Sequence, residues 1–430
     1  MLPRHAAPLL LLAAPLAASS GSWTKVTLDS VRYPLALCLD GSPGAFYVSP
    51  GADPRVLIHV QGGGWCTSVA SCAQRADPSY VPYAGQSSLG SSTPWAASGC
   101  AAAASAGGGA APQPAPVCVA DGGDHGALSA DPAVNPLFYN WTKAFIGYCS
   151  GDSLAGAAEA PIAINATSSF YFRGRYILDG ALDTLLSSHG LAAAPVVVYK
   201  GCSAGGMAVF LSADRVRARV LAANPAALFL AAPGAGAILH TPAIDGTFPL
   251  DPQLQWLWAT ANMSGSAAPA CLAAHPGAGH MCFYPQVSLP YTATPLFVSN
   301  SLADLAQASA VMGLNCTPTT PGSCSAAQLA YLNEFRVAML AGLAPVLASD
   351  AGGAWLPECF VHVLENDDYE WSRVVVVGQT QRDTFAAWFA ARSGGAPPPG
   401  VFAKAVDGGW GSNPTCAAPA AARRYPPLAA

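Results

Sequence analysis

The sequence has few charged residues, and this scarcity argues against several classes of function. Only 10% of the 430 residues are Asp, Glu, Lys or Arg, and the formal net charge at pH 7 is −5. Proteins that bind nucleic acids present clustered Lys and Arg side chains to the phosphates, and an acidic balance gives no such footprint. We therefore expect no nucleic-acid partner.

Beyond its N-terminus, the chain also lacks an apolar run long enough to span a membrane. Arg4 and His5 precede an apolar stretch over residues 6–18, which ends in small residues. This pattern is typical of a secretory signal peptide. The C-terminal "RRYPPLAA" lacks the hydrophobic tail of a lipid-anchor signal. We predict a signal peptide over residues 1–20, a mature chain over 21–430, and secretion to the cell wall without a transmembrane span.

The thirteen cysteines lack the paired C-x-x-C spacing of zinc ligands. In a secreted chain they predict disulfides instead, and their odd number leaves at least one thiol without an intrachain partner. Four Asn-x-Ser/Thr triplets are candidates for glycosylation in that compartment. These are Asn140, Asn165, Asn262 and Asn315.

No internal repeat and no linker divides the mature chain, so we predict a single domain. The low-complexity segment 98–118 is rich in Ala and Gly, cannot pack a core, and is interpreted as a surface insertion. "CTPTTPGSC" (316–324) predicts a loop closed by its own cysteines.

Short β-branched runs alternate with longer amphipathic stretches, which predicts an α/β-hydrolase-like fold. Such a fold has a mostly parallel central sheet flanked by helices. The expected strands are 55–61, 194–200 and 294–301, and the expected helices are 174–190, 205–221, 325–343 and 380–394.

The stretch "GCSAG" (201–205) matches G-x-S-x-G between a predicted strand and a predicted helix. In that context the motif forms a sharp turn that lifts the serine hydroxyl above the sheet, where a substrate can reach it. A chance match in a chain with 43 glycines is the alternative. The flanking strand and helix favour Ser203 as a nucleophile.

A second strand ends in "QGGGWC" (61–66), and glycines there let backbone N–H groups approach an oxyanion. We expect the N–H groups of Gly63, Gly64 (or Trp65) and Ala204 to form the oxyanion hole. A tight turn without function is the alternative. Phosphate binding is disfavoured because no G-K-[ST] follows the glycines.

The general base of this fold is a histidine that follows the acid in the chain, in the order Ser, Asp or Glu, His. His362 is the favoured candidate. His275 and His280 are alternatives, but they fall in Gly-, Ala- and Pro-rich sequence that predicts a loop. A metal bound by these two histidines is disfavoured because no acidic or cysteine partners accompany them.

The acid must lie between the nucleophile and the base. Asp304 follows the predicted strand 294–301, at the end of the strand where active-site residues of this fold class collect. Asp245 is the competing candidate, although its position before a glycine is typical of an Asx turn. We favour Asp304.

Further motifs extend the pattern along nearly the whole mature chain. They are "CLDGSPGAFYV" (38–48), "VQGGGWC" (60–66), "LSADPAVNPLFYNWTKAFIGYCSGD" (128–152), "YFRGRYILDGALDTLL" (171–186), "GCSAGG" (201–206), "CFYPQ" (282–286), "TPLFVSNSLADLAQ" (294–307), "CFVHV" (359–363) and "NPTC" (413–416). In this combination the sequence resembles the pectin acetylesterase / Notum family of secreted carboxylester hydrolases. The resemblance implies an α/β-hydrolase-like fold with a Ser203–Asp304–His362 triad, the same residues that spacing selected.

The sequence departs from the family pattern in three places. The plant enzymes carry an aspartate in a D-x-G-x-F stretch, whereas residues 230–240 here contain none, and their cysteine after the histidine is Val363 here. The insertion near 100–116 has no counterpart.

The wording of "SADPAVNPLFYNW" and "CFYPQ" is similar to the plant branch of the family. The resemblance therefore implies removal of O-acetyl groups from a pectin-like polysaccharide, without a metal or organic cofactor. The animal branch implies the alternative of a fatty-acyl esterase acting on a lipidated protein. A secreted module that binds carbohydrate or lipid without turnover is a second alternative, but it has no need of a complete triad.

Overall fold

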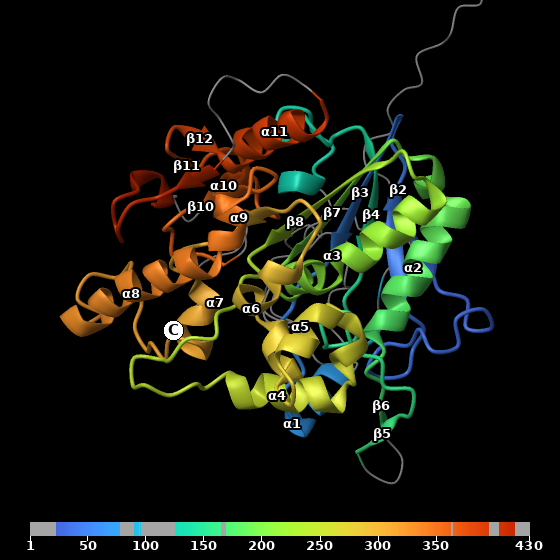
Figure 1. The fold of residues 1–430 in the computed structure, drawn as a ribbon, viewed down its shortest axis with the longest axis horizontal. Coiled ribbons are helices and arrows are strands. Elements are labelled where there is room, and N and C mark those ends of the chain that lie inside the picture. The colour runs from blue at the N-terminus through green and yellow to red at the C-terminus, as the bar shows by residue number, and fades with distance from the viewer. Residues whose placement is uncertain are drawn as a thin grey trace, which may run out of the picture.

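The computed structural model describes residues 23–77, 90–93, 95, 125–164, 169–362, 364–394 and 404–417, and their fold is organised around a nine-stranded sheet (Figure 1). The predicted signal peptide, the segment 98–118, Asn165 and Val363 lie outside these ranges. In spatial order, the strands are β1 (Thr24–Thr27), β2 (Ala45–Ser49), β4 (Trp141–Ile146), β3 (Asp53–Val60), β7 (Val196–Cys202), β8 (Leu228–Gly234), β9 (Phe297–Ser299), β10 (Gly353–Leu356) and β13 (Lys404–Val406).

The sheet is mostly parallel, as predicted. Only the pairs at the β1 edge, β1 with β2 and β2 with β4, are antiparallel in this sheet, and the other neighbouring strands are parallel. Two small antiparallel sheets lie apart from it. They pair β5 (Ile162–Ala163) with β6 (Ser169–Phe170), and β11 (Val375–Val376) with β12 (Gln379–Thr380).

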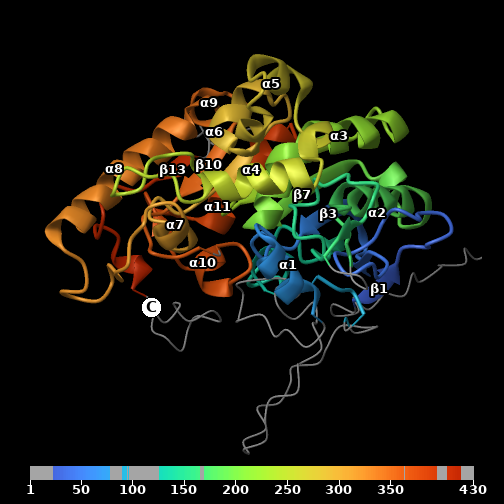
Figure 2. The same cartoon turned by 90° about the horizontal axis from the view of Figure 1, so that it is seen from below.

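Helices connect the strands. They are α1 (Val69–Ala76), α2 (Gly174–Ser188), α3 (Ala204–Ala223), α4 (Asp251–Thr260), α5 (Pro269–Ala274), α6 (Pro285–Ser288), α7 (Leu305–Ala310), α8 (Ala326–Gly342), α9 (Ala344–Ala348), α10 (Asp368–Ser372) and α11 (Gln381–Arg392). In both Figure 1 and Figure 2 the short helices α4, α5 and α6, in yellow, lie together. No helix in the described ranges is long and apolar enough to cross a membrane.

Two consecutive residues of β7 show that both faces of the sheet are covered. The Tyr199 hydroxyl lies 2.9 Å from the Ser212 hydroxyl of α3. The ammonium of Lys200 lies 5.7 Å from the ring centre of Trp371 in α10 and 5.3 Å from that of Phe385 in α11. Because neighbouring side chains on a strand point to opposite faces, α3 covers one face while α10 and α11 cover the other. A parallel sheet buried on both faces explains the apolar central strands.

The strands predicted from β-branched runs and the helices predicted from amphipathic stretches are confirmed. The three expected strands are β3, β7 and β9, and the four expected helices are α2, α3, α8 and α11. Gly190, just beyond α2, has the positive φ (78°) that a helix end often requires. Strands β2, β4, β8 and β10 were not predicted, because short buried apolar runs carry no periodicity that separates strand from helix.

Five disulfides staple the described residues, as the cysteine count predicted. They join Cys38 to Cys149, Cys66 to Cys72, Cys271 to Cys282, Cys316 to Cys324 and Cys359 to Cys416. The bond between Cys316 and Cys324 confirms the predicted closed loop. Cys202 is a free and buried thiol.

Candidate active site

Ser203 occupies the turn between β7 and α3, so the strand–turn–helix context of G-x-S-x-G is confirmed. Its backbone has φ 59° and ψ −124°, a combination that residues other than glycine rarely adopt. Two hydrogen bonds hold this backbone in place. The Ser203 N–H donates to the Gly234 carbonyl (2.9 Å), and the Ser203 carbonyl accepts from the Met207 N–H in α3 (2.9 Å).

The small residues at this turn are needed because backbone from α3, β7 and β3 passes very close. A Cβ on Gly201 would lie 2.2 Å from the Gly205 carbonyl oxygen, and one on Gly205 would lie 2.2 Å from the Val60 carbonyl oxygen of β3. A Cβ on Gly62 would lie 2.4 Å from the Cys202 carbonyl oxygen. The sharp turn and the glycine run therefore fit together only when these positions have no side chain.

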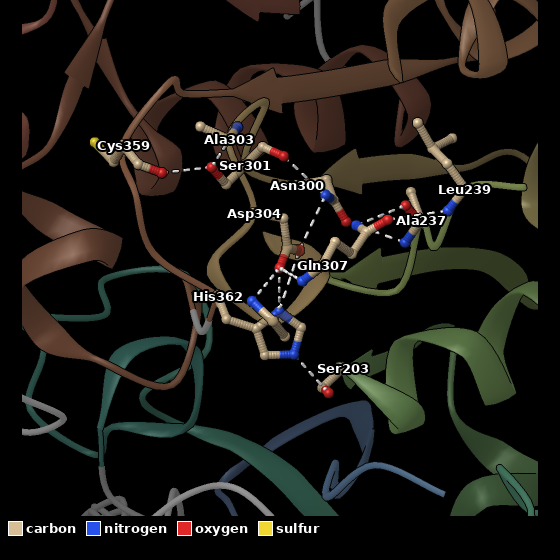
Figure 3. A network of polar contacts seen from close by, with 11 residues as sticks. Ser203, Ala237, Leu239, Asn300, Ser301, Ala303, Asp304, Gln307, Cys359 and His362 are labelled. Carbon is tan, nitrogen blue, oxygen red and sulfur yellow. Dashed lines mark hydrogen bonds and ion pairs between the residues drawn. The ribbon is translucent and has the colours of Figure 1, made fainter. Parts of the chain in front are cut away.

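The structure brings together the three residues that the sequence selected (Figure 3). The His362 Nε2 lies 2.7 Å from the Ser203 Oγ, and the His362 Nδ1 lies 2.9 Å from Oδ1 and 3.1 Å from Oδ2 of Asp304. An ionised carboxylate can only accept hydrogen bonds, so Nδ1 carries the proton. In the neutral ring, Nε2 then accepts from the serine hydroxyl.

Asp304 is fully buried and has a second role as the N-cap of α7. Its Oδ1 accepts hydrogen bonds from the backbone N–H groups of Ala306 (2.9 Å) and Gln307 (3.3 Å). The Asn300 side chain donates to Oδ2 (3.4 Å). These donors hold the carboxylate in its orientation toward His362.

Asn300 and Gln307 also fix the loop after β8, as Figure 3 shows. Gln307 accepts from the Leu239 N–H (3.0 Å) and donates to the Ala237 carbonyl (3.2 Å), and Asn300 accepts from the Ala237 N–H (3.0 Å). Sequence reasoning missed both residues. The signal that could have found them is the cluster of polar residues around Asp304 in "SNSLADLAQ".

The charges around His362 favour its protonated form. Burial by itself lowers the pKa of His362. The Asp304 carboxylate, its hydrogen bond and the charge of Glu365 raise the pKa, and together they outweigh the effect of burial. The net pKa of His362 therefore lies above its ordinary value. An imidazole of this kind is a stronger base, suited to accept the proton of a serine hydroxyl.

The glycine run that was expected to supply oxyanion donors contains two anchored peptide units. Gly63 and Gly64 have positive φ values, 138° and 67°. The Gly63 carbonyl accepts from Arg75 (2.7 Å), and the Gly64 carbonyl accepts from the Tyr148 hydroxyl (2.9 Å). In a trans peptide the C=O and N–H point in opposite directions. These anchors therefore direct the N–H groups of Gly64 and Trp65 away from Arg75 and from the Tyr148 hydroxyl, respectively.

A chain of hydrogen bonds links the glycine run to the start of α3. The Trp65 indole donates to the Ser153 Oγ (2.7 Å), which donates to the Ala204 carbonyl (2.7 Å). The N–H groups of Gly63, Gly64 and Ala204 make no hydrogen bond to any other residue that the structure describes. Sequence reasoning missed Arg75, Tyr148 and Ser153, because nothing local in their sequence points to the glycine run.

The competing candidates lie elsewhere. Asp245 is exposed and accepts from the Thr247 N–H (2.9 Å) and hydroxyl (2.6 Å), which is the Asx turn its sequence predicted. His275 follows α5 in irregular backbone, as expected. His280, expected in a loop, lies instead in a short 3-10 helix (Gly279–Phe283), and its Nε2 is 3.7 Å from the Asp251 carboxylate.

Known proteins resemble this chain in sequence and in fold. The sequence model of the pectinacetylesterase family matches residues 18–104 and 121–417. Pectin acetylesterase 7 of Arabidopsis thaliana is 29% identical over 425 residues, which cover 95% of this chain and 96% of that protein. Pectin acetylesterase 11 of the same plant is 27% identical over 406 residues, 91% of this chain and 92% of that protein.

More distant matches come from animals. The palmitoleoyl-protein carboxylesterase NOTUM of Drosophila melanogaster is 28% identical over 335 residues, 76% of this chain but 42% of that protein. The solved structure of the Wnt deacylase Notum from Drosophila superimposes with a TM-score of 0.71 and covers 92% of this chain and 99% of that one. At 21% sequence identity, this likeness establishes the α/β-hydrolase-like fold alone.

Proposed function

Because the chain belongs to the pectinacetylesterase family and is thus a carboxylic ester hydrolase, we propose that it is a secreted serine esterase that removes O-acetyl groups from pectin-like polysaccharide. The observation that carries the proposal is the hydrogen-bonded line from Ser203 Oγ to His362 (2.7 Å) and on to Asp304 (2.9 Å). Its members stand in the chain order that α/β-hydrolases use.

In the proposed mechanism, His362 takes the proton of Ser203 as Oγ attacks the ester carbonyl. Asp304 keeps the proton on Nδ1 and stabilises the imidazolium that forms. Backbone N–H groups at Gly63 or Gly64 and Ala204 donate to the oxyanion, each contributing about 3 kcal/mol to transition-state stabilisation. His362 then protonates the departing alcohol, and water releases acetate from the acyl-enzyme.

The proposed substrate class rests on the extent of the similarity. The plant pectin acetylesterases match this chain over 92% and 96% of their own length, whereas the Drosophila NOTUM relative matches over 42% of its length. The disulfides favour an oxidising compartment, which supports secretion. A fatty-acyl esterase is the second candidate, supported by the animal relatives.

The test compares p-nitrophenyl acetate, p-nitrophenyl octanoate and acetylated pectin as substrates for the wild-type protein and Ser203→Ala. We expect acetate release from pectin and preference for the acetyl ester, both abolished by the substitution. Preference for octanoate would favour the fatty-acyl candidate. No turnover of any ester by folded wild-type protein would overturn the proposal and favour a binding module.

A further inference from the structure

Glu365 lies three residues beyond His362 and is completely buried, although the mechanism above assigns it no role. Its Oε2 accepts a hydrogen bond from the Ser299 hydroxyl at the end of β9 (2.9 Å). The same carboxylate packs directly on the end of β8, since a Cβ on Gly234 would lie 1.7 Å from Oε2. Its backbone carbonyl accepts from the Ala127 N–H (2.9 Å).

These contacts connect Glu365 to the segments that hold all three triad residues. Ser299 ends the strand that leads to Asp304. Gly234 accepts the N–H hydrogen bond of Ser203 through its carbonyl (2.9 Å). His362 belongs to the same irregular segment as Glu365. A single buried side chain therefore lies where the supports of nucleophile, acid and base meet.

The surroundings of Glu365 are charged as well as tightly packed. Burial raises the pKa of Glu365 and lowers the pKa of Lys200 on β7, while the attraction between the two groups opposes both shifts. The charge of this carboxylate also acts on His362 and Cys202, and the neutral amide of Gln381 in α11 lies near it. A carboxylate is costly to bury unless a cation compensates it.

The basic residue nearest to this role is Lys200 on β7, the strand next to β8. Lys200 is 1% exposed and lies against the rings of Trp371 and Phe385. His59 on β3 stands in register with Lys200, and burial together with the Lys200 charge lowers the pKa of His59 to about 3. His59 is therefore neutral at physiological pH, which leaves Lys200 as the basic residue whose charge acts on Glu365.

We propose that Glu365 is a positioning residue of the esterase reaction that fixes the His362 segment against the ends of β8 and β9. The inference rests on the proposed function of the triad. Through these contacts Glu365 keeps His362 Nε2 within hydrogen-bond distance of Ser203, and its negative charge favours the imidazolium formed during attack. Displacing a catalytic group by about 1 Å costs on the order of 100-fold in rate.

The experiment uses Glu365→Gln, which keeps the side-chain volume and an acceptor for Ser299 but removes the charge. We expect kcat per active site, titrated with a fluorophosphonate, to fall about 10- to 100-fold while KM changes less than about twofold. The acidic limb of the pH profile of kcat/KM should move to lower pH, because removing a nearby negative charge lowers the pKa of His362.

Two further variants separate positioning from folding. Lys200→Met leaves the buried carboxylate without its cation and should lower both Tm and kcat. The double variant Lys200→Met/Glu365→Gln removes both charges and should recover Tm toward the wild-type value while kcat stays low.

Glu358→Gln is the matched control. Glu358 is 2% exposed, and its carboxylate accepts from Ser412 and the Asn413 N–H (2.7 Å each). This variant should keep the wild-type kcat and acidic limb.

A Glu365→Gln enzyme with wild-type kcat per active site and an unmoved acidic limb would overturn the inference, whatever its Tm. That result differs from failure of the proposed function, in which Ser203→Ala would leave ester turnover intact and the fluorophosphonate would label no site. The two failures are therefore distinguishable within one set of assays.

Discussion

The turn that holds Ser203 and the segment that holds His362 are built in different ways. The first is the G-x-S-x-G stretch 201–205 at the junction of β7 and the 20-residue helix α3, and its glycines admit the passing backbone. The second runs between β10 and α10 without regular structure at His362. Its position depends on the disulfide between Cys359 and Cys416 and on contacts from Ser299 and Ser301. Ser203, the proposed nucleophile, is therefore placed by local sequence, and His362, the proposed base, by tertiary contacts.

The largest expected effect comes from the acid that connects to the base. In Asp304→Asn the N-cap of α7 survives, but the carboxylate that fixes the His362 tautomer is lost. We expect kcat to fall by about 10⁴-fold, and stability to fall only by the contribution of the charged pair with His362. Asp304→Ala should be equally inactive and about 1 kcal/mol less stable, because it also loses the cap. Ester kinetics and urea unfolding measure the two effects, and an active Asp304→Asn enzyme would contradict the assignment.

Removing the disulfide near His362 should disrupt the tertiary contacts that place His362. Cys359 and Cys416 are 57 residues apart, so loop entropy gives their bond about 4 kcal/mol of stability. The double alanine variant should unfold at lower urea and lose kcat. The control is the double alanine variant of Cys316 and Cys324, 8 residues apart, which should lose about 2.5 kcal/mol and keep kcat. Equal activity of the two variants would show that the bond at Cys359 does not position the base.

Gly205→Ala should disrupt the turn that local sequence forms around Ser203. Its Cβ would meet the Val60 carbonyl oxygen at 2.2 Å, and we expect a loss of about 3 kcal/mol together with most of the activity. Gly190→Ala is the control, because a Cβ on Gly190 would have no atom within 4 Å and only its left-handed backbone (φ 78°) would be strained. It should cost about 1 kcal/mol and leave kcat unchanged. Similar losses in the two variants would mean that close packing at the turn is unimportant.

The smallest expected effects are the changes of kcat/KM and of Tm with pH that the His362–Asp304 pair causes. Because the neutral imidazole is the base, kcat/KM should fall as pH drops through the raised pKa of His362, above the ordinary value of about 6.5. The charged His362–Asp304 pair contributes stability that is fully present below the ordinary pKa and is lost as pH rises through the raised one. The Tm advantage of wild type over Asp304→Asn should therefore shrink at higher pH, and a constant difference would argue against the pair.

The sequence by itself determined the features that neighbouring residues encode. Short β-branched runs identified strands β3, β7 and β9, apolar periodicity identified four helices, glycine spacing identified the turn at Ser203, and chain order pointed to Asp304 and His362. The loop between Cys316 and Cys324 was equally local. Each of these signals lies within a few turns or strands of chain, where side-chain spacing and backbone freedom dictate the conformation.

The tertiary structure alone decided which distant residues support the site. Arg75 and Tyr148 anchor the glycine run, Cys38 pairs with Cys149 across 111 residues, and Glu365 joins the ends of β8 and β9 beneath the triad. No local pattern encodes these contacts, because each depends on which strands become neighbours in the sheet. Strand order follows from burying the apolar faces of the whole chain at once, a condition that no short stretch of sequence expresses.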